Sequence, residues 1–146
     1  MNIYFVCTGN TCRSPMAAAI LAHKNIEGIA VKSAGVYAGE GEPISHYAQM
    51  TLVQKQIFAA HASSQVNEVD LEWADIILTM TTRHKQLLVQ GYSEYVSKIY
   101  TLNEYTFGQA EDVMDPYGGD LSIYEQTYAQ LAAAIDQLVI KLQKEV

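Results

Sequence analysis

The sequence predicts a doubly wound α/β fold, with about four parallel strands, helices on both faces of the sheet and a phosphate loop after the first strand. Short apolar, β-branched runs alternate along the chain with segments of helical periodicity, and no long antiparallel run interrupts them. The length of 146 residues suffices for one hydrophobic core, so residues 1–146 are expected to form a single domain.

The first half of the chain begins with a buried strand, because the run Asn2 to Val6 is apolar, aromatic and β-branched. Ser14 suits an N-cap and Pro15 the first helical position, so the alanine-rich run after them predicts a helix. The other elements expected here are a strand at 29–33, a Gly-rich loop at 37–45, a helix at 45–56, a short strand or turn at 57–62 and a helix from the cap Asn67 to Trp73.

The second half is predicted to contain a buried strand at 75–80, a helix at 82–90 that Gly91 ends, and a last strand at 98–102. Residues 103–119 are predicted to be a long loop, whose length indicates a functional segment. From Asp120 onward, apolar residues recur at steps of three and four and predict a long C-terminal helix. The residues of this apolar stripe are Leu121, Tyr124, Tyr128, Leu131, Ile135, Leu138 and Leu142.

Composition argues against nucleic-acid and membrane functions. The formal net charge is −7 and the nine Lys and Arg residues are scattered, so no basic face for nucleic acid is expected. No apolar run approaches the ~20 residues that span a bilayer, and no signal peptide is visible. With only two cysteines and no export signal, we expect a reduced, cytoplasmic protein, and we expect a monomer.

The most informative motif follows the first strand and reads Cys7-Thr8-Gly9-Asn10-Thr11-Cys12-Arg13-Ser14-Pro15. Gly9 lets the loop curl tightly, and a strand, a loop and a helix N-terminus together direct free N–H groups inward. Such a cradle suits a tetrahedral oxyanion, with Cys7 as a thiolate nucleophile. Thiol pKa values in such places fall from ~8.5 towards ~3.5–7.5, so we expect an acidic Cys7.

Arg13 presents a planar fork that fits two phosphate oxygens at once. The loop residues expected to bind the phosphate are Thr8, Gly9, Asn10, Thr11, Cys12 and Arg13. The loop lacks the Gly-Lys-Ser/Thr ending of nucleotide-binding loops. The alternative is a buried structural cysteine followed by an incidental arginine. No cysteine or histidine has zinc-ligand spacing, so no metal is expected.

A second candidate group lies in the predicted long loop, which contains Asp112-Val113-Met114-Asp115-Pro116-Tyr117-Gly118-Gly119. Displacement of a leaving group from phosphorus needs a proton donor, and Asp115, stiffened by the following proline and placed beside Tyr117, is a candidate. The alternative is a simple turn before the last helix, with Asp120 as the helix cap.

Together, the loop motif, Ser33-Ala34-Gly35 and Asp115-Pro116-Tyr117 resemble the low-molecular-weight protein tyrosine phosphatase family, in order and along the whole chain. The resemblance implies phosphorylated proteins as substrates, Cys7 as nucleophile, Arg13 as phosphate clamp and Asp115 as general acid and then general base. It also implies that no metal and no organic cofactor takes part.

The resemblance further implies that Asn10 holds the loop in a strained shape through hydrogen bonds to Ser14, Ser33 and His61. The simpler interpretations are a polar strand end for Ser33 and a half-buried structural histidine for His61. The other histidines, His23, His46 and His84, fit no constellation and are expected at the surface.

Three features depart from the tyrosine-specific pattern and resemble the bacterial protein arginine phosphatase branch. Thr11 replaces an aliphatic residue, Gly118-Gly119 follow Tyr117 where a second aromatic is common, and residues 62–65 lack a basic residue. A threonine can position a hydrogen bond where an aliphatic side chain offers none to a guanidinium. Thr11 and Tyr117 are therefore the expected specificity residues, and the expected reaction is hydrolysis of the P–N bond of phosphoarginine in proteins.

The alternative activity within the family is that of a protein tyrosine phosphatase. Arsenate reduction would need cysteines beyond the two present. A phosphocarrier would not need Arg13 and Asp115, and a redox-sensing phospho-binding module would not need an intact catalytic set. Redox sensitivity is compatible with catalysis, because Cys12 could trap an oxidised Cys7 as a disulfide.

Overall fold

The structure is a computed structural model that describes residues 1–109 and 111–144. Its centre is a four-stranded sheet in the order β2-β1-β3-β4, in which all neighbouring strands are parallel. The strands are β1 (Asn2–Cys7), β2 (Ala30–Gly35), β3 (Ile76–Thr79) and β4 (Ile99–Thr101). The predicted fold class is confirmed.

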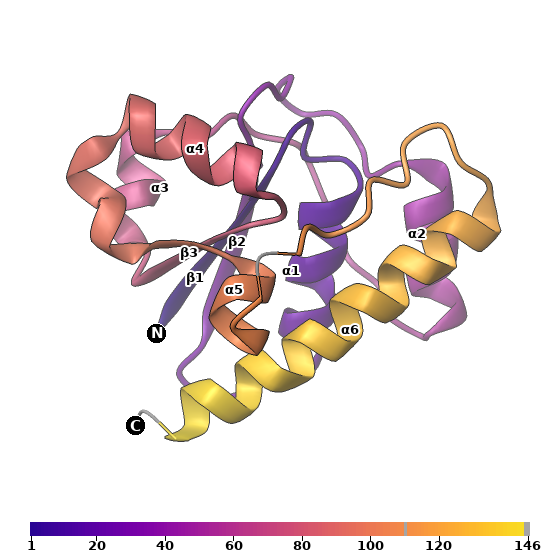
Figure 1. Cartoon of the computed structure of the whole chain (residues 1–146). Coiled ribbons are helices and arrows are strands. Elements are labelled where there is room, and N and C mark those ends of the chain that lie inside the picture. The colour runs from indigo at the N-terminus through magenta and orange to yellow at the C-terminus, as the bar shows by residue number, and fades with distance from the viewer. Residues whose placement is uncertain (110, 145–146) are drawn as a thin grey trace.

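Helices cover both faces of this sheet (Figure 1). The helices α1 (Arg13–His23), α2 (His46–Gln54), α5 (Leu102–Phe107) and α6 (Leu121–Lys144) contribute to one hydrophobic cluster. The helices α3 (Glu68–Trp73) and α4 (Thr82–Gly91) contribute to the other, with the 3-10 helix η1 (Ser93–Lys98) packed beside them. Two faces covered by helices explain why the central strands β1 and β3 read as nearly continuous apolar runs.

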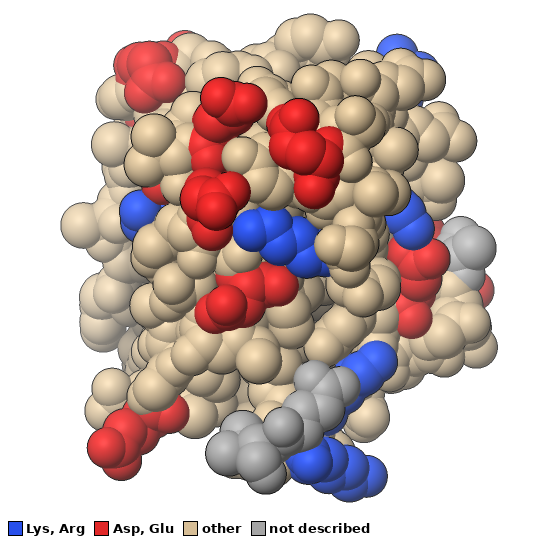
Figure 2. All heavy atoms as spheres, turned by 90° about the vertical axis from the view of Figure 1, so that its left-hand side faces the viewer, with Lys and Arg blue, Asp and Glu red and all other residues tan. Residues whose placement is uncertain are grey.

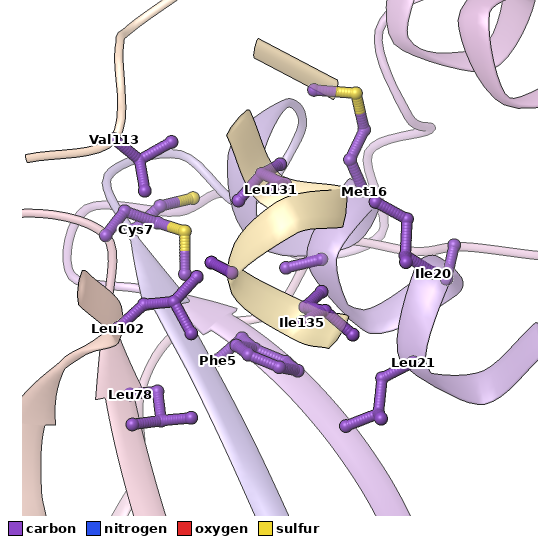
Figure 3. Close-up of a cluster of buried hydrophobic side chains, with 14 of the residues drawn as sticks. Phe5, Cys7, Met16, Ile20, Leu21, Leu78, Leu102, Val113, Leu131 and Ile135 are labelled. Carbon is purple, nitrogen blue, oxygen red and sulfur yellow. The ribbon is translucent and has the colours of Figure 1, made fainter. Parts of the chain in front are cut away.

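Strand β1 supplies both clusters, because successive side chains point to opposite faces. Phe5 and Cys7 belong to the cluster beneath α1 and α6, whereas Tyr4 and Val6 belong to the other. Figure 3 shows Phe5 near Ile135 of α6, with Cys7 between Val113 and Leu102. The nucleophile candidate therefore stands at the carboxyl end of a buried central strand.

Several predicted boundaries were wrong. Ser14 is not the cap of α1, because the helix begins at Arg13 and the Ser14 hydroxyl faces the loop instead. The strand predicted at 29–33 extends through Gly35, and residues 57–62 form neither a strand nor a turn. The predicted long loop starts with α5, whose first turn has a capping box between Thr101 and Glu104.

The order of the strands in the sheet explains where the candidate site lies. The chain passes from β1 to β2 on one side and then crosses to β3 on the other, so the loop after β1 lies at the point where the order reverses. On the face shown in Figure 2, acidic and basic side chains of the described residues are interspersed, so charges of both signs share this face. None of the described helices combines the length and the apolar character needed to cross a membrane.

Candidate active site

The loop between β1 and α1 is shaped by Asn10, which is buried and has a left-handed backbone with φ of 57°. Its side-chain amide donates to the hydroxyls of Ser14 at 2.8 Å and Ser33 at 3.0 Å. Its side-chain oxygen accepts from the backbone N–H of Ser64 at 3.0 Å, and its backbone oxygen lies 2.6 Å from Nε2 of His61. These contacts compensate the cost of the strained conformation.

The outer side of the loop rests on the segment after β2. The backbone N–H of Tyr37 donates to the Thr8 carbonyl at 2.9 Å, and that of Ser45 donates to the Thr11 carbonyl at 2.9 Å. Gly35 is packed so closely that a Cβ atom there would lie 2.2 Å from the Thr8 carbonyl oxygen. The glycine of the Ser33-Ala34-Gly35 motif is thus required for the close approach of two backbone segments.

Cys7 lies at the bottom of the loop and is 3% exposed. Burial raises the pKa of its thiol, while the Ser14 hydroxyl, 2.8 Å from Sγ, the backbone N–H groups of Ser14 and Asn10, and Arg13 lower it. The expectation of an acidic thiol is therefore wrong in its net direction. The donors that it assumed are in place, but removal of the sulfur from water outweighs them.

Arg13 connects the loop to the segment that contains Asp115. Its side chain is buried, its Nη1 donates to the Val113 carbonyl at 3.1 Å, and its Nη2 lies 3.7 Å from Asp115 Oδ2. The Asp115 side chain is 60% exposed, and its Oδ1 accepts from the backbone N–H of Tyr117 at 3.0 Å. The two charged groups thus lie side by side at the mouth of the loop.

The segment before Asp115 is held by three other elements. The Val113 N–H donates to the Met80 carbonyl after β3 at 2.9 Å. The Asp112 carboxylate accepts from the backbone N–H and the hydroxyl of Thr82, at the start of α4. Gln130 of α6 accepts from the Met114 N–H at 2.9 Å and donates to the Asp112 carbonyl at 3.0 Å. Asp115 is therefore fixed through its backbone neighbours.

These residues enclose a pocket of about 280 Å³. All the residues predicted for catalysis, phosphate binding and specificity line it: Cys7, Thr8, Gly9, Asn10, Thr11, Cys12, Arg13, Asp115 and Tyr117. Ser14, Ser33 and His61 contact Asn10 as the resemblance implied. The structure brings the whole predicted set together, although Asp115 and Tyr117 are about a hundred positions from the loop in the sequence.

Cys7 and Cys12 are both free and buried. Cys12 Sγ lies 3.3 Å from the hydroxyl of Tyr124 and 3.4 Å from that of Ser45. Burial raises the pKa of Tyr124 to about 12, so its hydroxyl stays protonated near neutral pH. A disulfide between Cys7 and Cys12 stays a prediction. Among the described residues, no group of three or more His, Cys, Asp or Glu side chains could hold a metal ion.

Sequence reasoning missed His84, which is buried rather than at the surface. Its Nε2 lies 2.8 Å from Oγ1 of Thr8 in the loop. No local pattern revealed this, because His84 comes from α4, far from the loop in the sequence. Gln130 and Ser64 were missed for the same reason.

The arrangement suits transfer of a phosphoryl group. It combines a sulfur inside backbone N–H donors, a buried guanidinium beside it and an exposed carboxylate at the mouth. The guanidinium and the N–H groups can hold a tetrahedral oxyanion, the sulfur can attack phosphorus, and the carboxyl group can exchange a proton with the leaving group.

Comparisons with known proteins agree with this geometry. The family model described as low molecular weight phosphotyrosine protein phosphatase matches residues 2–146. The chain is 47% identical to a protein-arginine-phosphatase of Geobacillus stearothermophilus, over 99% of this chain and 97% of that protein. It is 40% identical to a low molecular weight protein-tyrosine-phosphatase, PtpB, of Staphylococcus epidermidis, over 97% of this chain and 99% of that one.

Two solved structures are close in fold. The YwlE arginine phosphatase from Geobacillus stearothermophilus superposes with a TM-score of 0.97 at 46% identity, covering 99% of this chain and 94% of that chain. A YwlE arginine phosphatase described as a C7S mutant with a phosphorylated active site serine superposes with a TM-score of 0.95 at 41% identity, covering 99% and 97%.

Proposed function

The chain belongs to the low-molecular-weight phosphotyrosine protein phosphatase family, and we propose that within this family it hydrolyses the P–N bond of phosphoarginine in proteins. The observation that carries this proposal is the pocket in which Cys7, Arg13, Thr11 and Asp115 meet. Its loop offers nitrogen donors to a phosphoryl group, and its mouth offers a carboxylate to whatever is attached to phosphorus.

In the first step the Cys7 thiolate attacks phosphorus, the S–P bond forms and the P–N bond breaks. The guanidine nitrogen leaves with a proton from Asp115, which becomes a carboxylate. Arg13 and the loop N–H groups hold the phosphoryl oxygens. The Ser14 hydroxyl, 2.8 Å from Cys7 Sγ, stabilises the sulfur as an anion against the effect of its burial.

In the second step a water molecule attacks the phosphocysteine. Asp115 accepts a proton from this water, the S–P bond breaks, and inorganic phosphate and the Cys7 thiolate are released. The exposed Asp115 carboxylate lies beside Arg13 at the mouth of the pocket, which supports a role for Asp115 in both steps. The C7S mutant of the YwlE relative supports a phosphorylated intermediate, since its active-site serine is phosphorylated.

Preference for arginine is assigned to Thr11. Among the described residues its hydroxyl has only a long contact of 3.8 Å, to Cys12 Sγ, so it remains available for a hydrogen bond with the substrate. The names of the relatives from Geobacillus stearothermophilus and Bacillus subtilis, at 47% and 42% identity, support the same preference. Phosphotyrosine is the second candidate, because Tyr117 is 83% exposed and lines the pocket, where an aromatic substrate could stack on its ring.

The decisive experiment is the ratio of kcat/KM for phosphoarginine and phosphotyrosine peptides in wild type, Thr11→Ile and Thr11→Val. Wild type should favour phosphoarginine, and both variants should shift the ratio towards phosphotyrosine by about threefold to tenfold, the worth of one hydrogen bond. Thr11→Val keeps the branched shape of the side chain and removes only its hydroxyl. A shift seen in Thr11→Ile but not in Thr11→Val would therefore mean that the volume of the side chain, and not its hydroxyl, sets the specificity. A wild type that prefers phosphotyrosine, with no effect of residue 11, would overturn the proposal.

A further inference from the structure

One buried side chain behind the phosphate loop has no role in the mechanism above. His84 of α4 is 4% exposed, and its Nε2 lies 2.8 Å from Oγ1 of Thr8. The Thr81 hydroxyl accepts from the backbone N–H of His84 at 3.1 Å and caps this turn of the helix. Thr8 itself is exposed and lines the pocket. The imidazole therefore supports the wall of the pocket directly after the nucleophile.

The second nitrogen of the ring decides where its proton lies. Nδ1 of His84 is buried and has no hydrogen-bond partner among the described residues. An orphaned N–H inside a protein is rarer than an acceptor that lacks a partner. The proton of the neutral ring is therefore on Nε2, which donates it to Thr8 Oγ1.

The charge state of the ring agrees with this assignment. Burial lowers the pKa of His84 to about 4, and the positive charges of Arg13 and Arg83 act in the same direction. Asp112 and Asp115 act in the opposite direction but do not outweigh these effects. Near neutral pH the ring is uncharged and offers one donor.

A hydroxyl that accepts a hydrogen bond from a fixed donor keeps its own proton for another acceptor. The backbone carbonyl of Thr8 already accepts from the Tyr37 N–H at 2.9 Å. We propose that His84 is a positioning residue that orients the Thr8 hydroxyl to donate its proton to an oxygen of the phosphoryl group. The proposal rests on the proposed function, because that function supplies the acceptor.

Two measurements that do not depend on catalytic turnover test the inference. First, ¹⁵N chemical shifts of the His84 ring at pH 7 should show the neutral tautomer with the proton on Nε2. A proton on Nδ1, or a charged ring, would overturn the assignment. This readout uses the wild-type protein and does not depend on whether a variant folds.

Second, the dissociation constant of inorganic phosphate should be measured by calorimetry. Thr8→Val and His84→Phe should each weaken phosphate binding by about threefold to tenfold. Because both substitutions remove the same interaction, the double variant should bind phosphate no more weakly than the single variant with the lower affinity. His84→Gln retains an amide donor and should bind within about twofold of wild type. The matched control is His23→Gln at the exposed end of α1, which should have no effect.

Unchanged phosphate binding in Thr8→Val, or additive losses in the double variant, would refute the donor role of Thr8. The melting temperatures of the variants without phosphate separate a loss of folding from a loss of binding. Failure of the proposed function can be told apart from failure of this inference. A wild-type protein that does not hydrolyse phosphoarginine could still bind phosphate through His84 and Thr8 as described.

Discussion

The two walls of the pocket are built differently. The phosphate loop is contiguous in sequence, and its Cys7, Asn10, Arg13 and Ser14 side chains are buried and paired with one another or with neighbouring segments. The opposite wall comes from residues 111–117, and its Asp115 side chain is 60% exposed. Buried side chains hold the first wall, together with the backbone N–H groups of Tyr37 and Ser45, whereas the second wall is held mainly by hydrogen bonds to its backbone.

This difference separates two tasks. In the proposed mechanism the buried loop meets the phosphoryl group, which is the same in every substrate, so a fixed set of donors serves it. In the same mechanism the exposed Asp115 carboxylate meets the leaving group, which differs among substrates and projects from a protein surface. Met80 and Gln130 anchor the backbone of this segment and Thr82 anchors the Asp112 carboxylate, while the Asp115 side chain stays accessible. Substitutions should therefore divide into those that affect phosphate binding or the attack on phosphorus and those that affect leaving-group chemistry.

The largest effect is expected for Cys7→Ser in the loop wall. Turnover should fall by ~10⁴ or more, because the hydroxyl is a far weaker nucleophile than a thiolate. Phosphate and vanadate should still bind, because Arg13 and the loop N–H groups remain. Steady-state kinetics and calorimetry on the same sample measure both. Hydrolysis clearly above background would remove Cys7 from the mechanism.

Next is Asp115→Asn in the opposite wall, where kcat should fall by ~10²–10⁴ through loss of the proton donor. The decrease should shrink for substrates whose leaving group needs no proton, whereas phosphate affinity should change little. Asp112→Asn is the matched control, because an amide oxygen can still accept from Thr82. A larger loss in Asp112→Asn than in Asp115→Asn would show that the acid is misassigned.

Gly35→Ala should damage the loop wall without touching any reacting group. A Cβ 2.2 Å from the Thr8 carbonyl oxygen forces the loop or β2 to move. We expect a loss of about 1–3 kcal/mol in stability, as for other overpacked sites, and weaker phosphate binding. Gly91→Ala, with open space around it in α4, is the control and should leave both binding and activity unchanged. Denaturant titration and calorimetry measure the pair.

The smallest effect is expected for Gln130→Ala, which releases the backbone on both sides of Val113. Loss of these two hydrogen bonds should lower kcat by about threefold to tenfold, through a less well placed Asp115. Phosphate affinity should stay within about twofold of wild type. Gln126→Ala, exposed on the same helix, is the control. Equal losses in kcat and phosphate affinity would mean that the two walls are not independent.

The fold class and the tight loop between β1 and α1 could be predicted from the amino-acid sequence, because both depend on local patterns. The parallel sheet follows from the alternation of apolar runs, and the loop residues from Cys7 to Ser14 act as neighbours because a tight turn brings them together. The long helix α6 follows in the same way from an apolar stripe with period near 3.6. The six-residue helix α5 also had a local signal, the capping box of Thr101 and Glu104, which the prediction of a long loop overlooked.

Which distant side chains meet the loop could not be predicted, because that depends on how the helices pack. His84 from α4 and Gln130 from α6 come within hydrogen-bonding distance of Thr8 and Met114 because the sheet order places their helices beside the site. Packing also sets the direction of the Cys7 pKa, which the donors of the loop lower but burial raises. Periodicity and motif spacing act over a few residues, whereas desolvation and contacts between helices depend on how the whole chain packs.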